Sequence, residues 1–266
     1  MGTLVCFHAH PDDESISTGG SLARASAEGH RVVVVIATNG DFGEVPDDLA
    51  EGESLVDRRR AETARSAAAL GVHRVEWLGY KDSGMTGWEQ NADPASFLQA
   101  PVDDAAERLA KILREEHADV VTVYDWHGNY GHPDHIKVHT VGHRAAEMAG
   151  VEKVFEATIN RDHIVRIVAL ARESGAPISD EDDFDPNGPA DDGNPMGTPE
   201  AEITHAVDVT AHLDAKRASL RAHRSQITDT SFFLEMPDEA FAVAFGTEWF
   251  IRKGAEPGLH PGWLFE

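Results

Sequence analysis

Short, almost continuously apolar runs alternate with segments of helical periodicity between residues 3 and 159. Apolar runs of this kind suit strands that are covered on both faces, as in a parallel sheet. The expected strands are Thr3–Ala9, Arg31–Thr38, Arg74–Leu78, Ala118–Tyr124 and Lys153–Ile159. The expected helices are Glu14–Ala27, Leu55–Leu70, Asp103–His117 and Pro133–Ala149, with Gly29 and Gly71 as stops. This order predicts a Rossmann-like, doubly wound α/β fold with a mostly parallel sheet.

The chain changes in character after residue 173. Ser174–Glu200 holds an acidic run, Asp180–Asp185, and many Gly, Pro and Asn residues, so we expect a long, flexible acidic loop. Beyond it, the pattern predicts strands at Ile203–Val209 and Glu248–Arg252 and helices at Ala211–Ser225 and Pro237–Phe245. With 266 residues, 41% of them hydrophobic, we expect a single domain made of a core at 1–173, the loop at 174–200 and C-terminal elements at 201–266.

Charge and cysteine content narrow the classes of function. The formal net charge of −24 argues against a nucleic acid or an anionic membrane as the partner, because phosphate binding needs clustered Lys and Arg. The single Cys6 lies in an apolar run, which favours a buried core thiol over a nucleophile. No window approaches the roughly 18 apolar residues of a membrane span, and no leader pattern is present. We expect a cytoplasmic protein, and a homo-oligomer stays open.

Two of the expected strands run into segments rich in imidazoles and carboxylates. The first leads into the segment from His8 to Glu14, and the fourth leads into the segment from Tyr124 to His135. In an open α/β sheet, ligands bind outside the carboxyl ends of the strands, so both segments belong to one rim. A catalytic zinc site takes three ligands from His, Asp and Glu and leaves a fourth position for water. The residues therefore predict a metal site at this rim.

Neighbouring residues in each segment divide into ligands and catalytic groups. Pro133 suits the first helical position, which puts His132 and His135 on one side of a helix start, so that one can ligate while the other faces the substrate. Asp12 and Asp13 are adjacent, and one ligand and one general base is the natural division. The structural alternative is a turn that caps a helix, which is typical of two carboxylates after a proline. The residues alone leave the choice within each pair open.

Both segments resemble the zinc-dependent N-acetylglucosamine de-N-acetylase family, which is also called PIG-L or LmbE-like. The resemblance rests on His-Ala-His-Pro-Asp-Asp-Glu at 8–14 and Tyr-Gly-His-Pro-Asp-His at 130–135, and it extends to about residue 150. Asp82-Ser83-Gly84-Met85 is most similar to the mycothiol branch, which holds an inositol-glucosamine deacetylase and a conjugate amidase. The family implies an LmbE-like fold with Zn²⁺ as the cofactor, although Fe²⁺ or Co²⁺ also suits two His and one Asp.

Carried over position by position, the resemblance implies a role for each site residue. It implies zinc on His10, Asp13 and His135, with Asp12 as the general base. His132 would stabilise the oxyanion or act as the acid for the leaving amine, Tyr130 would donate to the carbonyl oxygen, and Asp134 would orient His132 or cap the helix. Ser17, Arg59 and Asp82 match the family's sugar-binding positions, and Gln226 is a further candidate contact. Each also has a purely structural alternative: Ser17 as a hydroxyl on the side of a helix, Arg59 as a surface arginine, Asp82 as a turn carboxylate and Gln226 as part of a helix end.

The resemblance implies a hydrolase that removes the N-acetyl group from a GlcNAc-containing small molecule. A second hypothesis keeps the metal but changes the scissile bond to a cysteinyl amide in a mycothiol S-conjugate. Asn129, which stands where the mycothiol branch usually has glycine, leaves the substrate open. A third hypothesis is a non-catalytic sugar- or nucleotide-binding module, but the chain lacks the Gly-rich phosphate-binding patterns.

Overall fold

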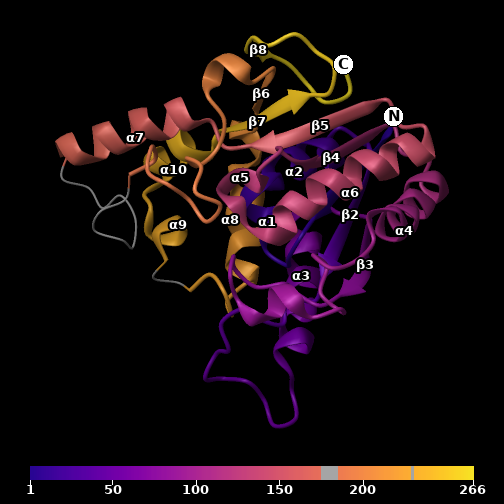
Figure 1. Cartoon of the computed structure of the whole chain (residues 1–266). Coiled ribbons are helices and arrows are strands. Elements are labelled where there is room, and N and C mark those ends of the chain that lie inside the picture. Colours follow the sequence, from indigo (N-terminus) through magenta and orange to yellow (C-terminus); the bar gives the residue numbers. More distant parts are fainter. Residues whose placement is uncertain (175–184, 229–230) are drawn as a thin grey trace.

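The computed structural model describes residues 1–174, 185–228 and 231–266. Within them, eight strands form one sheet in the order β3-β2-β1-β4-β5-β7-β6-β8 (Figure 1). The strands are β1 Thr3–His8, β2 Arg31–Thr38, β3 Arg74–Tyr80, β4 Val120–Tyr124, β5 Lys153–Thr158, β6 His205–Asp208, β7 Thr247–Arg252 and β8 His260–Pro261. The first five pair in parallel, whereas β7 runs antiparallel to β5 and β6. The predicted single-domain α/β fold with a mostly parallel sheet is confirmed.

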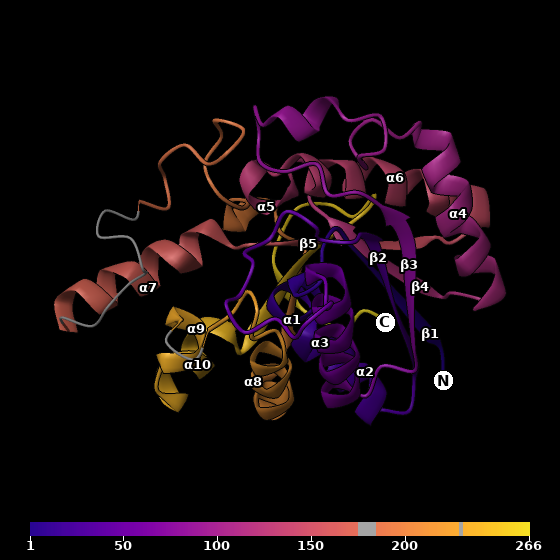
Figure 2. The same ribbon diagram turned by 90° about the horizontal axis from the view of Figure 1, so that it is seen from below.

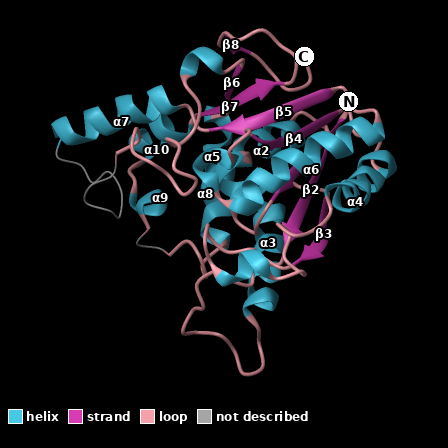
Figure 3. Cartoon of the chain, viewed as in Figure 1, coloured by secondary structure: helices cyan, strands magenta, loops and turns pink. Residues whose placement is uncertain are grey.

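Helices cover both faces of the sheet (Figure 3). They are α1 Asp13–Ser17, α2 Gly19–Ala27, α3 Leu55–Leu70, α4 Val102–Glu115, α5 Gly128–Gly131, α6 Pro133–Ala149, α7 Arg161–Ser174, α8 Leu213–Ala222, α9 Phe232–Glu235 and α10 Asp238–Phe245. Figure 2 shows α4 and α6 on one side of the sheet and α2, α3 and α8 on the other. Val5 and Phe7 of β1 belong to the first core, and Leu4 and Cys6 belong to the second. Burial on both faces explains why the strands are apolar along their length.

The expected helix Glu14–Ala27 is broken in two. Thr18, with a φ of −135°, separates α1 from α2. The carboxylate of Glu248, which lies on β7, accepts the N–H groups of Gly20 and Ser21 at 2.8 Å each. An anion at this position stabilises the start of α2, because the first N–H groups of a helix have no partner within it. The break therefore depends on a residue from the other end of the chain.

Three further expectations concern Cys6, the acidic loop and membrane spans. Cys6 is fully buried, and burial raises the pKa of its thiol to about 12, so the predicted core thiol is confirmed. The expected acidic loop Ser174–Glu200 lies partly outside the described residues, which resume at residue 185. Among the helices in the described ranges, none has the length and apolar character needed to cross a membrane.

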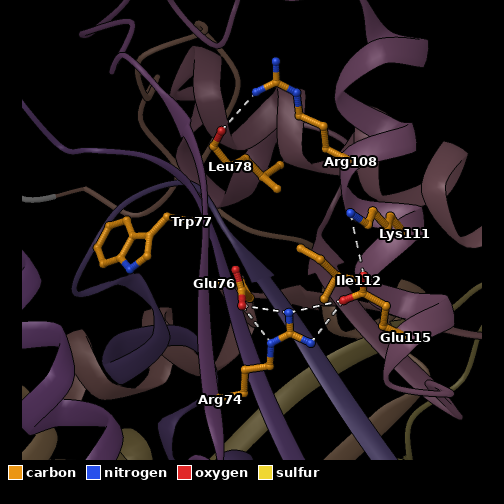
Figure 4. A pocket seen from close by; sticks show the side chains of 8 residues that line it. All are labelled: Arg74, Glu76, Trp77, Leu78, Arg108, Lys111, Ile112 and Glu115. Carbon is orange, nitrogen blue, oxygen red and sulfur yellow. Dashed lines mark hydrogen bonds and ion pairs between the residues drawn. The ribbon is translucent and has the colours of Figure 1, made fainter.

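A cavity of about 390 Å³ opens beside the edge strand β3 and helix α4 (Figure 4). It is lined by Arg74, Glu76, Trp77, Leu78, Arg108, Lys111, Ile112 and Glu115. Arg74 reaches Glu76 at 2.7 Å and Glu115 at 3.3 Å, so its charge is already paired. None of the predicted site residues lines this cavity.

Candidate metal centre

The predicted rim residues come together at the carboxyl ends of β1 and β4. These strands pair in parallel, and α6 packs against both. After β1 the chain turns through His10 into α1, and after β4 it passes through α5 into α6, which carries His135. His10, Asp13 and His135 are all buried. Tertiary structure thus unites segments that are 125 residues apart.

Three donor atoms converge at this rim. His10 Nδ1 lies 3.3 Å from His135 Nε2 and 3.5 Å from Asp13 Oδ2, and His135 Nε2 lies 3.4 Å from Asp13 Oδ2. Ligand atoms of a tetrahedral zinc ion, with bonds of about 2.0–2.1 Å, stand about 3.3 Å from one another. The backbone N–H of His10 donates to the same oxygen of Asp13 at 2.8 Å and holds the carboxylate in place. The three atoms match the spacing of a tetrahedral ligand set.

Two further carboxylates lie on the other side of His10. Its Nε2 is 3.3 Å from Asp134 Oδ2 and 3.5 Å from Asp82 Oδ1. His10 with Asp82 and Asp134, and His10 with His132 and His135, also have donor atoms within 4.8 Å of one another. We prefer the set with Asp13, because one carboxylate oxygen faces both imidazoles. Burial alone would lower the pKa of His10, but the carboxylates, Asp82 foremost, raise it well above the usual value. The centre is therefore built to hold positive charge, as a metal ion requires.

Asp12 stands beside the donor set in an unusual backbone conformation. Its φ is 93°, a left-handed value that is rare for a residue with a side chain and typical of functional sites. It precedes α1, but its side chain makes no capping hydrogen bond, which removes the structural alternative for this residue. Arg59 donates to Asp12 Oδ2 at 3.2 Å. Burial raises the pKa of Asp12 to about 6, against the opposing effect of Arg59.

A buried network beneath Asp12 reaches the C-terminal third of the chain. The N–H of Asp12 donates to Glu14 Oε2 at 3.0 Å, and Glu14 Oε1 lies 2.6 Å from His223 Nε2. Ser66 also donates to Glu14. Burial would raise the pKa of Glu14, but the charge and hydrogen bond of His223 lower it to about 2. Sequence reasoning missed this support, because His223 carries no motif and stood only within the expected helix Ala211–Ser225.

His132 and Asp134 do not form the expected pair. His132 Nδ1 accepts the backbone N–H of Asp134 at 3.1 Å. The carboxylate of Asp134 instead accepts the N–H of Ser83 at 2.9 Å and contacts His10 at 3.3 Å. Residues two apart on a helix point in different directions, so the Asp134 carboxylate orients His10 and not His132. Burial, together with His10 and His135, lowers the pKa of His132 to about 2, which leaves a neutral ring with its proton on Nε2.

Tyr130 lies over the centre from the short helix α5. Its ring meets that of His135 edge-on, with centroids 4.9 Å apart. Burial raises the pKa of Tyr130, so the phenol keeps its proton and can donate it. Asn129, just before it, has a φ of 68°. Asparagine tolerates this conformation better than most residues, so the loop can take this left-handed turn without a glycine here.

The candidate substrate contacts divide into three cases. Arg59 is 3% exposed, and its guanidinium donates to the carbonyl oxygens of Pro11 at 2.6 Å and Gly40 at 2.7 Å. It is therefore a buried part of the site and not a surface arginine. Asp82 is buried beside His10, and Ser17 is half-buried at the end of α1. Their contact with a substrate stays a prediction.

Two later segments hold the loops of the rim in place. Gln226 accepts the N–H of Glu44 at 3.1 Å and donates to its carbonyl at 2.9 Å, which makes it a clamp on the loop after β2. Asp191 donates its N–H to the carbonyl of Tyr130 at 2.9 Å, and its carboxylate accepts the N–H of Thr86 at 3.0 Å. The described end of the acidic segment therefore packs against the Tyr130 loop, a contact that sequence reasoning did not foresee.

Comparison with known proteins identifies the family of this chain. The PIG-L family model, described as GlcNAc-PI de-N-acetylase, matches residues 5–146. A relative from Nocardiopsis dassonvillei is 43% identical over 271 residues, which cover 96% of this chain and 95% of the relative. A relative from Acidothermus cellulolyticus is 40% identical and covers 94% of this chain and 88% of the relative. Both are named 1D-myo-inositol 2-acetamido-2-deoxy-alpha-D-glucopyranoside deacetylase.

Solved structures share the fold. The N,N'-diacetylchitobiose deacetylase of Pyrococcus horikoshii has a TM-score of 0.53 at 24% identity and covers 90% of this chain and 73% of its own. A deacetylase bound to teicoplanin has a TM-score of 0.58 at 18% identity, with 95% and 99% covered. The resemblance predicted from the motifs is thus confirmed by both family and relatives. The chain belongs to the PIG-L family and is an amide-hydrolysing deacetylase.

Proposed function

We propose that this deacetylase is a zinc-dependent hydrolase that removes the acetyl group from a GlcNAc-containing small molecule. The observation that carries the proposal is the convergence of His10 Nδ1, Asp13 Oδ2 and His135 Nε2 next to Asp12. Relatives at 35–43% identity are named for an acetamido-glucopyranoside of 1D-myo-inositol, so this glycoside is the substrate we propose first.

His10, Asp13 and His135 would hold the ion. When bound, a divalent ion there supplies a water of lowered pKa, near about 7, and polarises the amide carbonyl. The buried, negatively charged surroundings of His10 support a cation at this position. Zinc is the ion we propose because two imidazoles and a carboxylate at tetrahedral spacing suit it, although Fe²⁺ or Co²⁺ fits the same donors.

Asp12 is the proposed general base. It takes a proton from the attacking water and delivers it to the leaving amine, which is the chemistry that a carboxylate next to the ion can perform. Arg59 holds its carboxylate, and Glu14, backed by His223, holds its backbone N–H. Asp12 is therefore fixed from two sides in a strained conformation.

Tyr130 and His132 are the proposed donors to the carbonyl oxygen as it gains negative charge. Donors that are preorganised in a water-poor site stabilise such charge strongly. The Tyr130 phenol is protonated, and the accepting Nδ1 of His132 leaves an N–H at Nε2. Of the two roles considered for His132, this tautomer supports the electrostatic one. Asp134 then acts by holding His10.

A substrate comparison tests the proposal. Zinc-loaded protein is incubated with the inositol glycoside, with N-acetylglucosamine and with a mycothiol S-conjugate, and acetate, cysteinyl product and free amine are measured. We expect acetate from the glycoside, loss of turnover after chelation and its return with zinc. Turnover of the conjugate alone would favour the amidase hypothesis, and turnover that survives complete metal removal would contradict the metal mechanism.

The hypothesis of a non-catalytic binding module does not hold, because the chain belongs to a family of deacetylases.

A further inference from the structure

A second group of imidazoles lies on the same helix, outside the rim. His139 and His143 follow His135 on α6 at intervals of four residues, so the three share one side of the helix. Glu156 stands in the middle of β5, the strand that pairs with β4. One donor atom from each of His139, His143 and Glu156 lies within 4.8 Å of the others. None of these residues has a part in the proposed reaction.

The contacts in this group centre on one carboxylate oxygen. Glu156 Oε1 is 2.8 Å from His143 Nε2 and 3.8 Å from His139 Nδ1. The two imidazole rings meet edge-on with centroids 4.5 Å apart. Among the ion pairs of the described residues, Glu156 takes part only in those with these two imidazoles. Its charge therefore faces histidines and no lysine or arginine.

The group is both anchored and accessible. The side chains of His139, His143 and Glu156 are 24%, 18% and 15% exposed, so an ion can enter from solvent while the ring positions stay restrained. His139 Nδ1 lies 3.0 Å from the carbonyl oxygen of Tyr124. This contact restrains the ring of His139 beside Glu156. Nδ1 is also the nitrogen that faces Glu156, so to ligate through it His139 must carry its proton on Nε2 and release the carbonyl.

We propose that His139, His143 and Glu156 form a second divalent-cation site, separate from the rim. Two imidazoles and one carboxylate suit borderline ions such as Zn²⁺, Co²⁺ and Ni²⁺, and not Mg²⁺ or Ca²⁺, which prefer oxygen ligands. Binding replaces the hydrogen bond between His143 Nε2 and Glu156 Oε1 by one bond from each atom to the ion, and the displaced proton moves to Nδ1 of His143 or to solvent. The bound ion joins α6 to β5 and stabilises the folded state by an amount that grows with the ratio of ion concentration to Kd.

Binding of Co²⁺ to the whole, chelator-stripped chain tests this site. We expect two equivalents in calorimetry and in the visible spectrum: a tight one at the rim and a weaker one at the second group. His143→Ala and Glu156→Gln should each weaken the second equivalent at least about tenfold and leave the first unchanged, since even an outer partner of a ligand is worth about 10–100-fold in affinity. His260→Ala, at an exposed histidine on β8, is the matched control and should change neither.

The variant His135→Ala isolates the second site, because it removes a proposed ligand from the rim only. In that background, Co²⁺ should still raise the thermal unfolding midpoint, and Glu156→Gln should abolish this rise. Melting with chelator present shows whether each variant folds, and Glu156→Gln keeps the size of the side chain in case His143→Ala does not fold. A single equivalent in the unmodified chain, or a second one that is unaffected by both His143→Ala and Glu156→Gln, overturns the proposal.

Discussion

Helix α6 carries histidines in two different surroundings. At its start, His135 meets His10 from the loop after β1 and Asp13 from the start of α1, and two more carboxylates lie on the far side of His10. Further along, His139 and His143 meet the single carboxylate of Glu156. At the end of a strand, ligand side chains from several loops can meet. In the middle of a strand, such as at Glu156 on β5, only one such side chain faces the helix. Position along the helix therefore separates the buried centre proposed for catalysis from the more accessible group proposed as a second cation site.

Asp13→Ala gives the largest expected effect, because it removes a proposed metal ligand from the rim. Without this carboxylate, the tight metal equivalent and turnover should both fall to background, while the weaker equivalent on α6 persists. Metal content by mass spectrometry and acetate release measure the two losses. Asp82→Asn, on the other side of His10, is the control for metal binding. If Asp13→Ala keeps the tight equivalent and Asp82→Asn loses it, the ion is bound on the other side of His10, by Asp82 and Asp134.

Asp12→Asn separates catalysis from binding within the rim. Asparagine keeps the shape of the side chain and tolerates the φ of 93°, but it cannot take a proton. We expect turnover to fall by about 10²–10⁴-fold, the usual contribution of a general base, with the tight metal equivalent retained. Steady-state kinetics and metal analysis on the same sample decide the matter. If the metal is lost as well, the division between Asp12 and Asp13 is wrong.

His223→Ala breaks the support beneath the base. It leaves the carboxylate of Glu14, which is 1% exposed, without its cationic partner. Removing one member of a buried ion pair costs about 3–5 kcal/mol, and urea unfolding should show a loss of that order. The double variant with Glu14→Gln should recover part of it. Equal stability in the unmodified chain and His223→Ala would show that the pair contributes little.

The pH dependence of kcat/KM should reflect the ionisation of the Asp12 carboxyl. Burial raises the pKa of this carboxyl to about 6, and a bound cation nearby can only lower it. Only the ionised form accepts a proton, so kcat/KM should be constant above that pKa and fall about tenfold per pH unit below it. This acid limb should lie at or below about pH 6 and disappear in Asp12→Asn. A limb that persists unchanged in Asp12→Asn belongs to another group.

His143→Ala gives the smallest expected effect on turnover. Its group lies outside the rim and has no part in the proposed reaction, so kcat should stay close to that of the unmodified chain. The comparison with Asp13→Ala is sharpest when both variants are assayed in one metal buffer. A large loss of kcat in His143→Ala would show that the second group contributes to the reaction at the rim.

The fold was readable from the sequence where one strong periodic signal governed each element. The helix Leu55–Leu70 was predicted to the residue from its spacing and from Gly71, which adopts a left-handed conformation at its end. The structure adds a capping box of Ser54 and Asp57 at its start. The single helix predicted over Glu14–Ala27 failed, because Glu248 supplies the start of α2 from the other end of the chain. Local periodicity does not contain a partner that is 228 residues away.

In the candidate site, too, some features follow from the sequence and others depend on contacts between distant segments. By itself, the sequence determined the donor types, their two clusters and, through strand order, their meeting at one rim. Only the tertiary structure decided which atom faces which: one oxygen of Asp13 between two imidazoles, Asp134 on His10, and His223 beneath Asp12. The reason is physical, because residue type sets what a side chain can bind, while its direction depends on packing between segments that are distant in sequence.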